Sequence, residues 1–313
     1  METTDAAAPV HVRERPSHHI TVCICTFKRE ALLREVLEHV EHQKTDGQFT
    51  FSVVVCDNDS SESAKPVAAQ FAQKSGVPVR YVVEPYQNIA RARNRAVAAS
   101  HGDYVAFLDD DEIPENEWLL SHFITCNDYG ADGTLGATLP VFADKTPSWI
   151  VKGPWFRRRR HRTGTVIPWT LGRTGNTLLA KKLFSPDVTA FNPEFISGED
   201  QDFFRRQIGN GRKFVWCDEA LTNEIIPFSR WTARYLIRRS LMRGKMTAQH
   251  PTIGWYDIAK SATAIVAYSL IVPFFFLFGS RRGMEYFVKI FDHAGLMFGF
   301  MGADFSRETY TPR

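Results

Sequence analysis

Short apolar runs alternate with helical segments along the first part of the chain, and this alternation constrains the fold more than any other feature. Such runs lie at 20–25, where β-branched residues predominate, and at 51–56, 79–83 and 104–108. Between and after them, apolar residues follow helical spacing at 30–43, 64–74, 88–100 and 115–127. Strands that alternate with helices of about 10–15 residues form βαβ units. The sequence therefore predicts an α/β fold with a doubly wound, mostly parallel sheet.

The pattern becomes irregular and rich in Trp, Pro and Gly between about residues 140 and 175. This stretch contains the basic run 157–162, and because long connections are usually functional, we interpret the run as a mobile basic lid or a solvated face. Strand character returns at 176–181 and 213–216, and a helix is expected at 202–208.

Polar side chains follow the predicted strands at the edge where parallel sheets bind ligands. Thr26, Lys28 and Arg29 follow the first strand, Asp-Asn-Asp-Ser at 57–60 follows the second, and Asp-Asp-Asp-Glu at 109–112 follows the fourth. The chain has neither a GxGxxG dinucleotide fingerprint nor a GxxxxGK[ST] phosphate loop. We therefore expect a ligand site of another kind at this edge.

The acidic run 109–112 is the sharpest chemical signal. Four consecutive carboxylates repel one another, so a partner must stabilise them. Hard oxygen ligands suit Mg²⁺ or Mn²⁺, and the cation could then hold a diphosphate. The alternative is an acidic turn that caps the following helix.

Three other groups of residues admit two interpretations each. The carboxylates of 57–60 either cap the next helix or accept hydrogen bonds from a nucleoside. Of Arg91, Arg93 and Arg95, one that points into the cleft would meet phosphate, whereas the others would be solvated. Glu199 and Asp200 are either ordinary first-turn partners of a helix dipole or an orienting group and a general base.

Composition limits the class of protein further. A hydrophobic fraction of 44% with a net charge of +3 excludes a disordered chain. The five cysteines form no CxxC motif, which favours free core thiols in a reducing compartment. The first 19 residues are polar and have no apolar core, so we expect no secretory signal and a cytoplasmic location.

The C-terminal part is basic and contains a long uncharged segment. Residues 226–313 hold 12 Lys/Arg against 5 Asp/Glu, and 261–280 carry no charge. We favour a helical pair that lies in or dips into a membrane interface, over a true span or an ordinary buried hairpin. The basic runs lack the interleaved aromatics of a nucleic-acid module, so no nucleic-acid partner is expected.

Several motifs, taken in order, resemble glycosyltransferase family 2. They are Thr26 with a nearby basic residue, VVVCDNDS, Ala-Arg-Asn at 92–94, FLDDDE and GEDQDFF, and they cover about residues 18–225. The resemblance implies the GT-A fold, a nucleotide-activated sugar donor and inversion at the anomeric carbon. FLDDDE is similar to the metal-binding DxD motif, and GEDQDFF to the motif that supplies the base.

Within that family, NIARARN, RTGNTLL and the basic C-terminal helix resemble the succinoglycan β-1,4-glucosyltransferase subfamily. This likeness implies UDP-glucose as donor, a polyprenyl-diphosphate-linked oligosaccharide as acceptor, and a peripheral or shallowly inserted position at the cytoplasmic face of the inner membrane. The QxxRW motif of processive synthases is incomplete, because only Phe-Ser-Arg-Trp occurs at 228–231. This departure favours the addition of a single sugar.

The resemblance also assigns roles to residues. The base would be Asp200, with Glu199 beside it, and Mn²⁺ or Mg²⁺ would bind Asp109 and Asp111. The nucleotide sugar would contact Thr26, Arg29, Asp57, Asp59, Arg93, Asn94, Asp109 and Asp110. The acceptor or its diphosphate would contact Asn176, Glu224, Arg239 and Arg243.

We expect an N-terminal tail at 1–18, the GT-A domain at 19–225 and a membrane-associated segment at 226–313. Two other classes stay open at this point. One is a nucleotidyl- or phosphotransferase, which also uses acidic strand ends with Mg²⁺. The other is a non-catalytic module that docks on membranes.

Overall fold

The computed structural model describes residues 18–184, 190–195, 198–248 and 253–303. The predicted tail at 1–18 and the predicted lack of a secretory signal therefore fall almost entirely outside the described residues.

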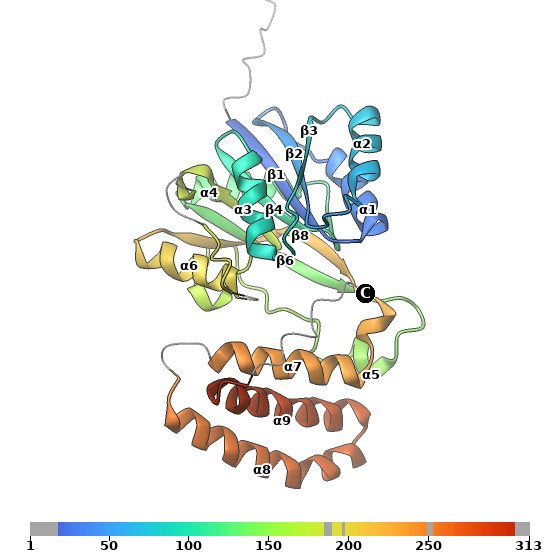
Figure 1. Cartoon of the computed structure of the whole chain (residues 1–313), viewed down its shortest axis with the longest axis vertical. Coiled ribbons are helices and arrows are strands. Elements are labelled where there is room, and N and C mark those ends of the chain that lie inside the picture. Colours follow the sequence, from blue (N-terminus) through green and yellow to red (C-terminus); the bar gives the residue numbers. More distant parts are fainter. Residues whose placement is uncertain (1–17, 185–189, 196–197, 249–252, 304–313) are drawn as a thin grey trace, which may run out of the picture.

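A mixed sheet forms the centre of the larger part of the molecule (Figure 1). Its described strands follow the order β3-β2-β1-β4-β7-β6-β8-β5. Their bounds are β1 His18–Thr26, β2 Phe49–Asp57, β3 Val79–Val83, β4 Tyr104–Asp109, β5 Glu112–Pro114, β6 Gly133–Val141, β7 Asn176–Ala180 and β8 Phe214–Ile225. The strands β1 to β4 are parallel to one another, whereas β7 runs antiparallel to β4 and β6, and β5 antiparallel to β8.

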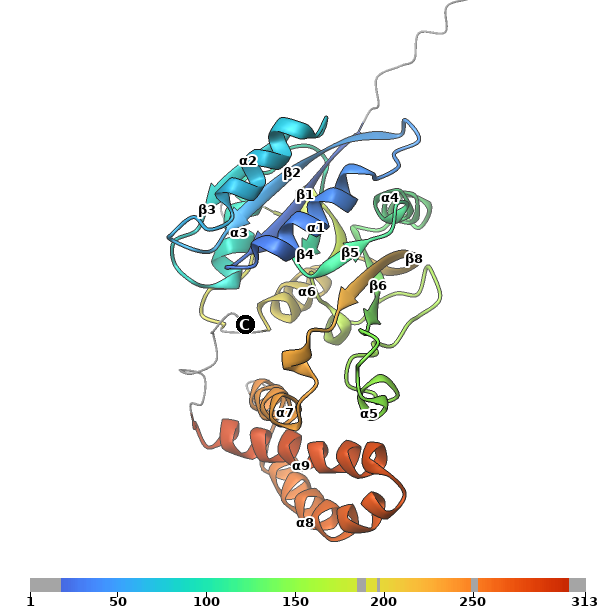
Figure 2. The same cartoon turned by 90° about the vertical axis from the view of Figure 1, so that its right-hand side faces the viewer.

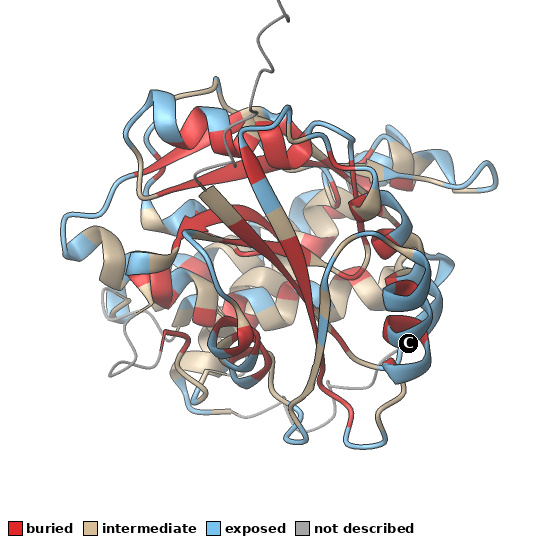
Figure 3. Ribbon diagram, turned by 90° about the horizontal axis from the view of Figure 1, so that it is seen from above, coloured by how far each residue is buried: buried red, intermediate tan, exposed pale blue. Residues whose placement is uncertain are grey.

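Helices cover both faces of the sheet, as the prediction of a doubly wound fold requires. They are α1 Glu30–Glu41, α2 Lys65–Lys74, α3 Ile89–Ala99, α4 Trp118–Asp128 and α6 Glu199–Gly209. The short helix α5 Ser148–Val151 lies away from the sheet and contributes Ile150 to a third core cluster (Figure 2). The first core cluster joins α1, α2 and α4 to the sheet, and the second joins α3 and α6. Figure 3 shows the buried strands between these layers.

The βαβ prediction is confirmed for the first four strands. Asn88 caps α3, because its side chain accepts a hydrogen bond from the Arg91 backbone N–H at 3.0 Å. The cysteines are free: Cys25 is half-buried and the other four are buried. This finding agrees with the free core thiols that the sequence predicts.

Two strands were not predicted and a third is longer than predicted. The sequence indicates neither β5 nor β6, and β8 extends from the predicted 213–216 to Ile225. The strand β6 is hard to predict from the sequence because it contains glycine, which disfavours strands in general. At Gly136, however, its lack of a side chain is required: a Cβ there would collide with the Ala220 carbonyl and the Asn176 side chain.

Three helices follow the sheet: α7 Ala233–Ala248, α8 Trp255–Leu277 and α9 Ser280–Phe300. They stack away from the sheet in the order α7, α9, α8 (Figure 2). The close packing of α7 on α9 depends on glycine, because a Cβ at Gly244 or Gly295 would collide with the facing backbone. The predicted helical C-terminal segment is therefore confirmed.

Candidate active site

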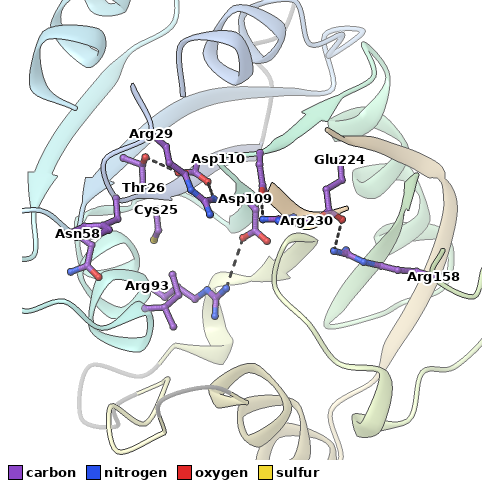
Figure 4. Close-up of a pocket in the computed structure, with 13 residues that line it drawn as sticks. Cys25, Thr26, Arg29, Asn58, Arg93, Asp109, Asp110, Arg158, Glu224 and Arg230 are labelled. Carbon is purple, nitrogen blue, oxygen red and sulfur yellow. Dashed lines mark hydrogen bonds and ion pairs between the residues drawn. The ribbon is translucent and has the colours of Figure 1, made fainter. Parts of the chain in front are cut away.

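A cavity of about 410 Å³ lies where β1 and β4 end, at the sheet edge that the sequence predicts (Figure 4). Parallel register brings Cys25, near the end of β1, beside Asp109, the last residue of β4. The cavity is lined by Cys25, Thr26, Phe27, Arg29, Asn58, Ile89, Arg93, Asp109, Asp110, Asp111, Arg158, Glu224 and Arg230.

The acidic run forms the turn between β4 and β5 and contributes three side chains to this cavity. The alternative of a helix-capping turn is wrong, because β5 intervenes and α4 begins only at Trp118. The connection from β4 to β5 is so short that Asp109, Asp110 and Asp111 remain together at one edge of the sheet.

Arginines from distant segments stabilise the acidic run in this structure. Arg29 donates to Asp110 at 2.8 Å and lies 3.4 Å from Asp111. Arg230 donates to Asp111 at 3.0 Å. Thr26 adds a hydroxyl bond to Asp110 at 2.7 Å. The guanidinium groups thus supply the compensating charge that the sequence led us to expect from a divalent cation.

The second half of this network joins the acidic run to β8. Arg158 donates to Glu112 and to Glu224, each at 3.0 Å, and Arg230 donates to Glu224 at 2.7 Å. The predicted lid is thus held to the sheet, and Arg160 is similarly paired with Asp218 at 2.8 Å. The sequence predicts no specific partner for Arg158 or Arg230. It marks them only through the basic run 157–162 and the incomplete motif at 228–231.

Burial raises the pKa values of two of these carboxyl groups. It raises the pKa of Asp110 to about 6, although the neighbouring Arg29 acts in the opposite direction. It also raises the pKa of Glu112 to about 7, against the effect of Arg158. Removing carboxylates from water disfavours their charged form, so the pairs with arginine only partly offset the cost of burial.

The side chains at the cavity provide a partial ligand set for a hard cation. Asp109 is 43% exposed and has one arginine contact, with Arg93 at 3.9 Å. Asp111 also lines the cavity. Among the residues that the structure describes, no three His, Cys, Asp or Glu side chains form a complete metal centre. Two carboxylates fit Mg²⁺ or Mn²⁺ when substrate phosphates supply further ligands.

Arg93 connects this cavity to the start of α6. Of the three helix arginines it is the buried one, whereas Arg91 and Arg95 are exposed. It forms an ion pair with the buried Glu199 as well as the contact with Asp109. Two motifs that lie far apart in the sequence thereby meet on one guanidinium group.

Asp200 follows Glu199 in the first turn of α6, after Gly198 in the left-handed conformation (φ 89°). Its carboxylate accepts a hydrogen bond from the Gln201 backbone N–H at 2.7 Å. Burial, with the negative charge of Glu199, raises the pKa of Asp200 to about 6. A carboxylate with such a pKa is suited to general base catalysis near neutral pH.

Three predicted nucleotide-binding residues lie outside the cavity lining. Asp57 is fully buried and accepts hydrogen bonds from the Ala64 N–H and the Tyr81 hydroxyl, both at 2.8 Å. Asp59 binds Ser61. These bonds order the loop between β2 and α2, whereas no side chain caps α2 itself. A nucleotide contact by Asp57 or Asp59 stays a prediction, and Asn58 lines the cavity instead.

The third residue, Asn94, fixes a loop. Its side chain donates to the Phe191 carbonyl at 2.7 Å and accepts from the Phe191 N–H at 3.0 Å. These bonds hold the segment that precedes α6, so a nucleotide contact by Asn94 also stays a prediction.

The prediction that Asn176 contacts the acceptor is wrong. Asn176 is fully buried, and its carbonyl oxygen accepts hydrogen bonds from Trp118 at 2.7 Å and from His122 at 2.8 Å. Its amide nitrogen donates to the carbonyls of Ala137 and Ala220. Asn176 joins strands and a helix inside the core and has no access to a ligand.

The other residues predicted on the acceptor side divide between two places. Glu224 lines the cavity described above. Arg239 and Arg243 line a separate cavity between α7 and α9. Arg243 is paired there with Asp292 at 2.6 Å.

Comparison with known proteins agrees with the motifs. The sequence profile described as "Glycosyl transferase family 2" matches residues 21–181. The succinoglycan biosynthesis protein ExoM of Rhizobium meliloti is 27% identical over 300 residues, which cover 91% of this chain and 93% of that protein. The glycosyltransferase AglE of Haloferax volcanii is 28% identical over 208 residues, covering 64% and 65%.

The fold resembles that of S. aureus TarS. The structure of TarS superposes with a TM-score of 0.52 and 16% identity, covering 90% of this chain and 55% of that chain. The structure of TarS 1–349 in complex with UDP-GlcNAc gives a TM-score of 0.51 and 14% identity, covering 90% of each. This likeness supports the GT-A fold. Together with the profile match, the fold and the motifs show that the chain belongs to glycosyl transferase family 2.

Proposed function

We propose that this glycosyltransferase moves a hexose, glucose in particular, from a UDP-sugar to a polyprenyl-diphosphate-linked oligosaccharide in exopolysaccharide biosynthesis. The similarity to ExoM, a succinoglycan biosynthesis protein, supports the pathway class. The complex of TarS with UDP-GlcNAc supports a UDP-sugar donor. The observation that carries the proposal is the contact of one side chain, Arg93, with both Asp109 and Glu199.

This arrangement divides the reaction between two sides of one site. Arg158 and Arg230 face the cavity with guanidinium groups that suit a diphosphate. Asp200 would accept the proton of the acceptor hydroxyl as its oxygen forms a bond to the anomeric carbon. The bond from that carbon to UDP breaks, and UDP leaves with the electron pair. Attack opposite the leaving group inverts the anomeric centre.

Asp109 and Asp111 would hold Mn²⁺ or Mg²⁺ together with the donor diphosphate. When bound, the cation acts as a Lewis acid that stabilises the charge of the leaving group. Glu199, through its pair with Arg93, keeps the start of α6 close to the cavity.

We expect one class of sugar nucleotide to raise the melting temperature in the presence of Mn²⁺. The measurement is a thermal-shift panel of UDP-, GDP- and CDP-sugars, with and without Mn²⁺, on wild type and on Asp111→Ala. A ligand at a hundred times its Kd stabilises the folded state by about 2.7 kcal/mol. The shift should appear with UDP-sugars and be lost in the variant.

The products distinguish the remaining classes. A glycosidic product supports the transferase, whereas a pyrophosphate or phosphorylated product would support a nucleotidyl- or phosphotransferase. If no sugar nucleotide shifts the melting temperature of folded protein, the transferase proposal fails in favour of a module that only docks on membranes.

We also propose that α8 lies on the cytoplasmic face of the inner membrane. Among the described residues it is the one helix long and apolar enough to cross a membrane, and only 11% of its most apolar window is buried. The face opposite α9 is apolar: Val266, Leu270, Phe274 and Leu277 are 60–81% exposed. Trp255 and Tyr256 lie at one end, and Arg281 and Arg282 follow the other. Such a face suits an anionic bilayer surface.

The packing of α9 favours a helix that lies flat over one that crosses the bilayer. Tyr268 and Phe275 of α8 stack on rings of α9. If α8 crossed, α9 would enter the hydrocarbon with it, together with Lys289 and Asp292. Charged side chains at that depth are costly. A flat helix immerses its apolar face and leaves the charges of α9 in water.

A charge on this face is expected to abolish membrane binding. Val266→Glu should prevent co-flotation with vesicles that contain anionic lipid, because the new carboxylate enters the apolar layer. Val166→Glu is the matched control, since Val166 is 61% exposed and lies far from α8 beside β8. Flotation of the Val266→Glu protein at the wild-type level would contradict the proposal.

A further inference from the structure

A second cavity, of about 260 Å³, lies where α7 and α9 meet the segment that follows α5. It shares no lining residue with the first cavity. In Figure 2 this junction lies on the sheet side of α8. Its charged lining residues are Arg239, Arg243, Lys289, Glu285 and Asp292, and its other lining residues are Pro154, Trp155, Leu236, Ser240 and Val288.

One donor in this cavity lacks an acceptor. The indole N–H of Trp155 is buried and has no hydrogen-bond partner among the described residues. The ring is held in place because Trp149 packs against it edge-on, with ring centroids 5.5 Å apart. A Cβ at Gly153 would collide with this ring, so the chain places it tightly. Buried indole groups normally find an acceptor, which indicates that a ligand supplies one here.

A cation that lines the same cavity lacks a carboxylate partner. Within the described part of the chain, no carboxylate lies at ion-pairing distance from Arg239, which donates to the Trp155 carbonyl at 3.2 Å and lies over the Phe156 ring. Burial lowers the pKa of Arg239, although Tyr235 and Glu224 act in the opposite direction, and repulsion from other arginines adds to the lowering. A bound anion would favour the charged form of Arg239.

The remaining charges of the cavity leave an excess of positive charge. Arg243 and Asp292 neutralise each other through a close pair. Lys289 lies 4.9 Å over the Tyr286 ring and, like Arg239, has no ion pair within the described ranges. Two cations therefore face one carboxylate, Glu285. The donors at Trp155 and Arg239 select a ligand with several acceptor oxygens.

We propose that this second cavity binds a phosphate or diphosphate group through Arg239 and the Trp155 indole. Phosphate oxygens suit both the guanidinium fork and the N–H donor. The source is either the diphosphate of the lipid-linked acceptor or a soluble phosphate compound. The position between the sheet and α8 favours the lipid carrier. That assignment rests on the proposed function, whereas phosphate binding itself does not.

The first test is titration calorimetry with inorganic pyrophosphate on the full chain. Saturating UDP is present throughout, so that the first cavity is occupied. Arg239→Gln is expected to weaken pyrophosphate binding at least tenfold. Trp155→Phe keeps the ring and removes only the N–H, and it should weaken binding severalfold. Arg234→Gln is the control, because Arg234 is exposed on the same helix and lines neither cavity.

Two results would overturn phosphate binding: no pyrophosphate binding by the UDP-saturated wild type, or wild-type affinity in both variants. Circular dichroism and the UDP affinity of each variant verify that it is folded. If Arg239→Gln does not fold, Trp155→Phe alone decides the question.

The second test separates the two sources of phosphate. With lipid-linked acceptor in vesicles, Arg239→Gln should raise the KM for the acceptor and leave UDP affinity unchanged. A variant that loses pyrophosphate binding but keeps the wild-type acceptor KM would overturn the lipid carrier as the source. If the wild type binds UDP yet transfers no sugar, the proposed function fails, and the pyrophosphate result still stands on its own.

Discussion

Replacing Asp200 with asparagine is expected to leave UDP-sugar binding intact and to slow glycosyl transfer about 10²–10⁴-fold. The carboxylate lies at the start of α6, beside the Glu199–Arg93 pair that reaches Asp109. Asparagine keeps the size of the side chain but cannot accept the proton of the acceptor hydroxyl. Isothermal titration with UDP-sugar and an initial-rate assay on the same protein measure the two effects separately.

The pH dependence provides a second readout of the same residue. With a pKa of about 6, Asp200 is mostly deprotonated at pH 7 and becomes protonated as the pH falls. Because only the deprotonated form is a base, kcat/KM should fall on the acid side and reach about one tenth of its plateau at pH 5.

Asp202→Asn is the matched control for this substitution. Asp202 lies in the same turn, but ion pairs with Arg205 and Arg206, each at 2.8 Å, hold its carboxylate. Its removal should leave the rate near that of the wild type. Normal turnover by Asp200→Asn would remove Asp200 from the mechanism.

Replacing Asn176 with alanine is expected to lower the free energy of unfolding by about 3–5 kcal/mol. The change leaves the Trp118 and His122 donors and the Ala137 and Ala220 carbonyls without this partner, and each buried unpaired group costs about 1–3 kcal/mol. Urea unfolding followed by circular dichroism measures the loss.

The hydrogen bonds of His122 increase this cost. Burial lowers the pKa of His122 to about 4, so the ring is neutral at pH 7. Because the Asn176 oxygen only accepts, the Nε2 of His122 must carry the proton, and its Nδ1 accepts from Thr134. In the other tautomer Nδ1 would donate to the Thr134 hydroxyl, and Nε2 would become a buried acceptor without a donor, so a change of tautomer does not restore the lost bond.

Asn210→Ala serves as the control for Asn176. Asn210 is exposed at the end of α6, so its replacement should change the unfolding free energy by about 0.5 kcal/mol or less. Equal stability of the two variants would mean that the network around Asn176 contributes little.

The residues that the sequence placed correctly are those whose position follows from the local order of strands and helices. Thr26 and Asp109 are the last residues of their strands and Asp111 follows β4 closely, and parallel pairing brings strand ends to one edge. The interaction of Arg93 with the cavity was likewise one of the alternatives that the helix pattern allowed.

The residues that escaped prediction depend on side-chain contacts between distant segments. Nothing near Arg158 in the sequence indicates that it meets Glu112 and Glu224, which the pairing of β5 with β8 places side by side. Arg230 follows β8 closely, but nothing in the sequence indicates its ion pair with Asp111. Asn176 was misassigned for the same reason. A polar residue at the start of a strand near a predicted site suggests a ligand contact, whereas tertiary packing places it in the core.

The position of β8 has a consequence for biosynthesis. This strand is the last of the described sheet in sequence, yet it lies between β6 and β5. Until the ribosome has released residue 225, β5 lacks its partner and one edge of β6 is open. The nascent chain therefore passes through a stage with unpaired strand edges, and such edges promote association between chains. A gene fragment that ends at residue 181 would stop at this stage, because it lacks β8.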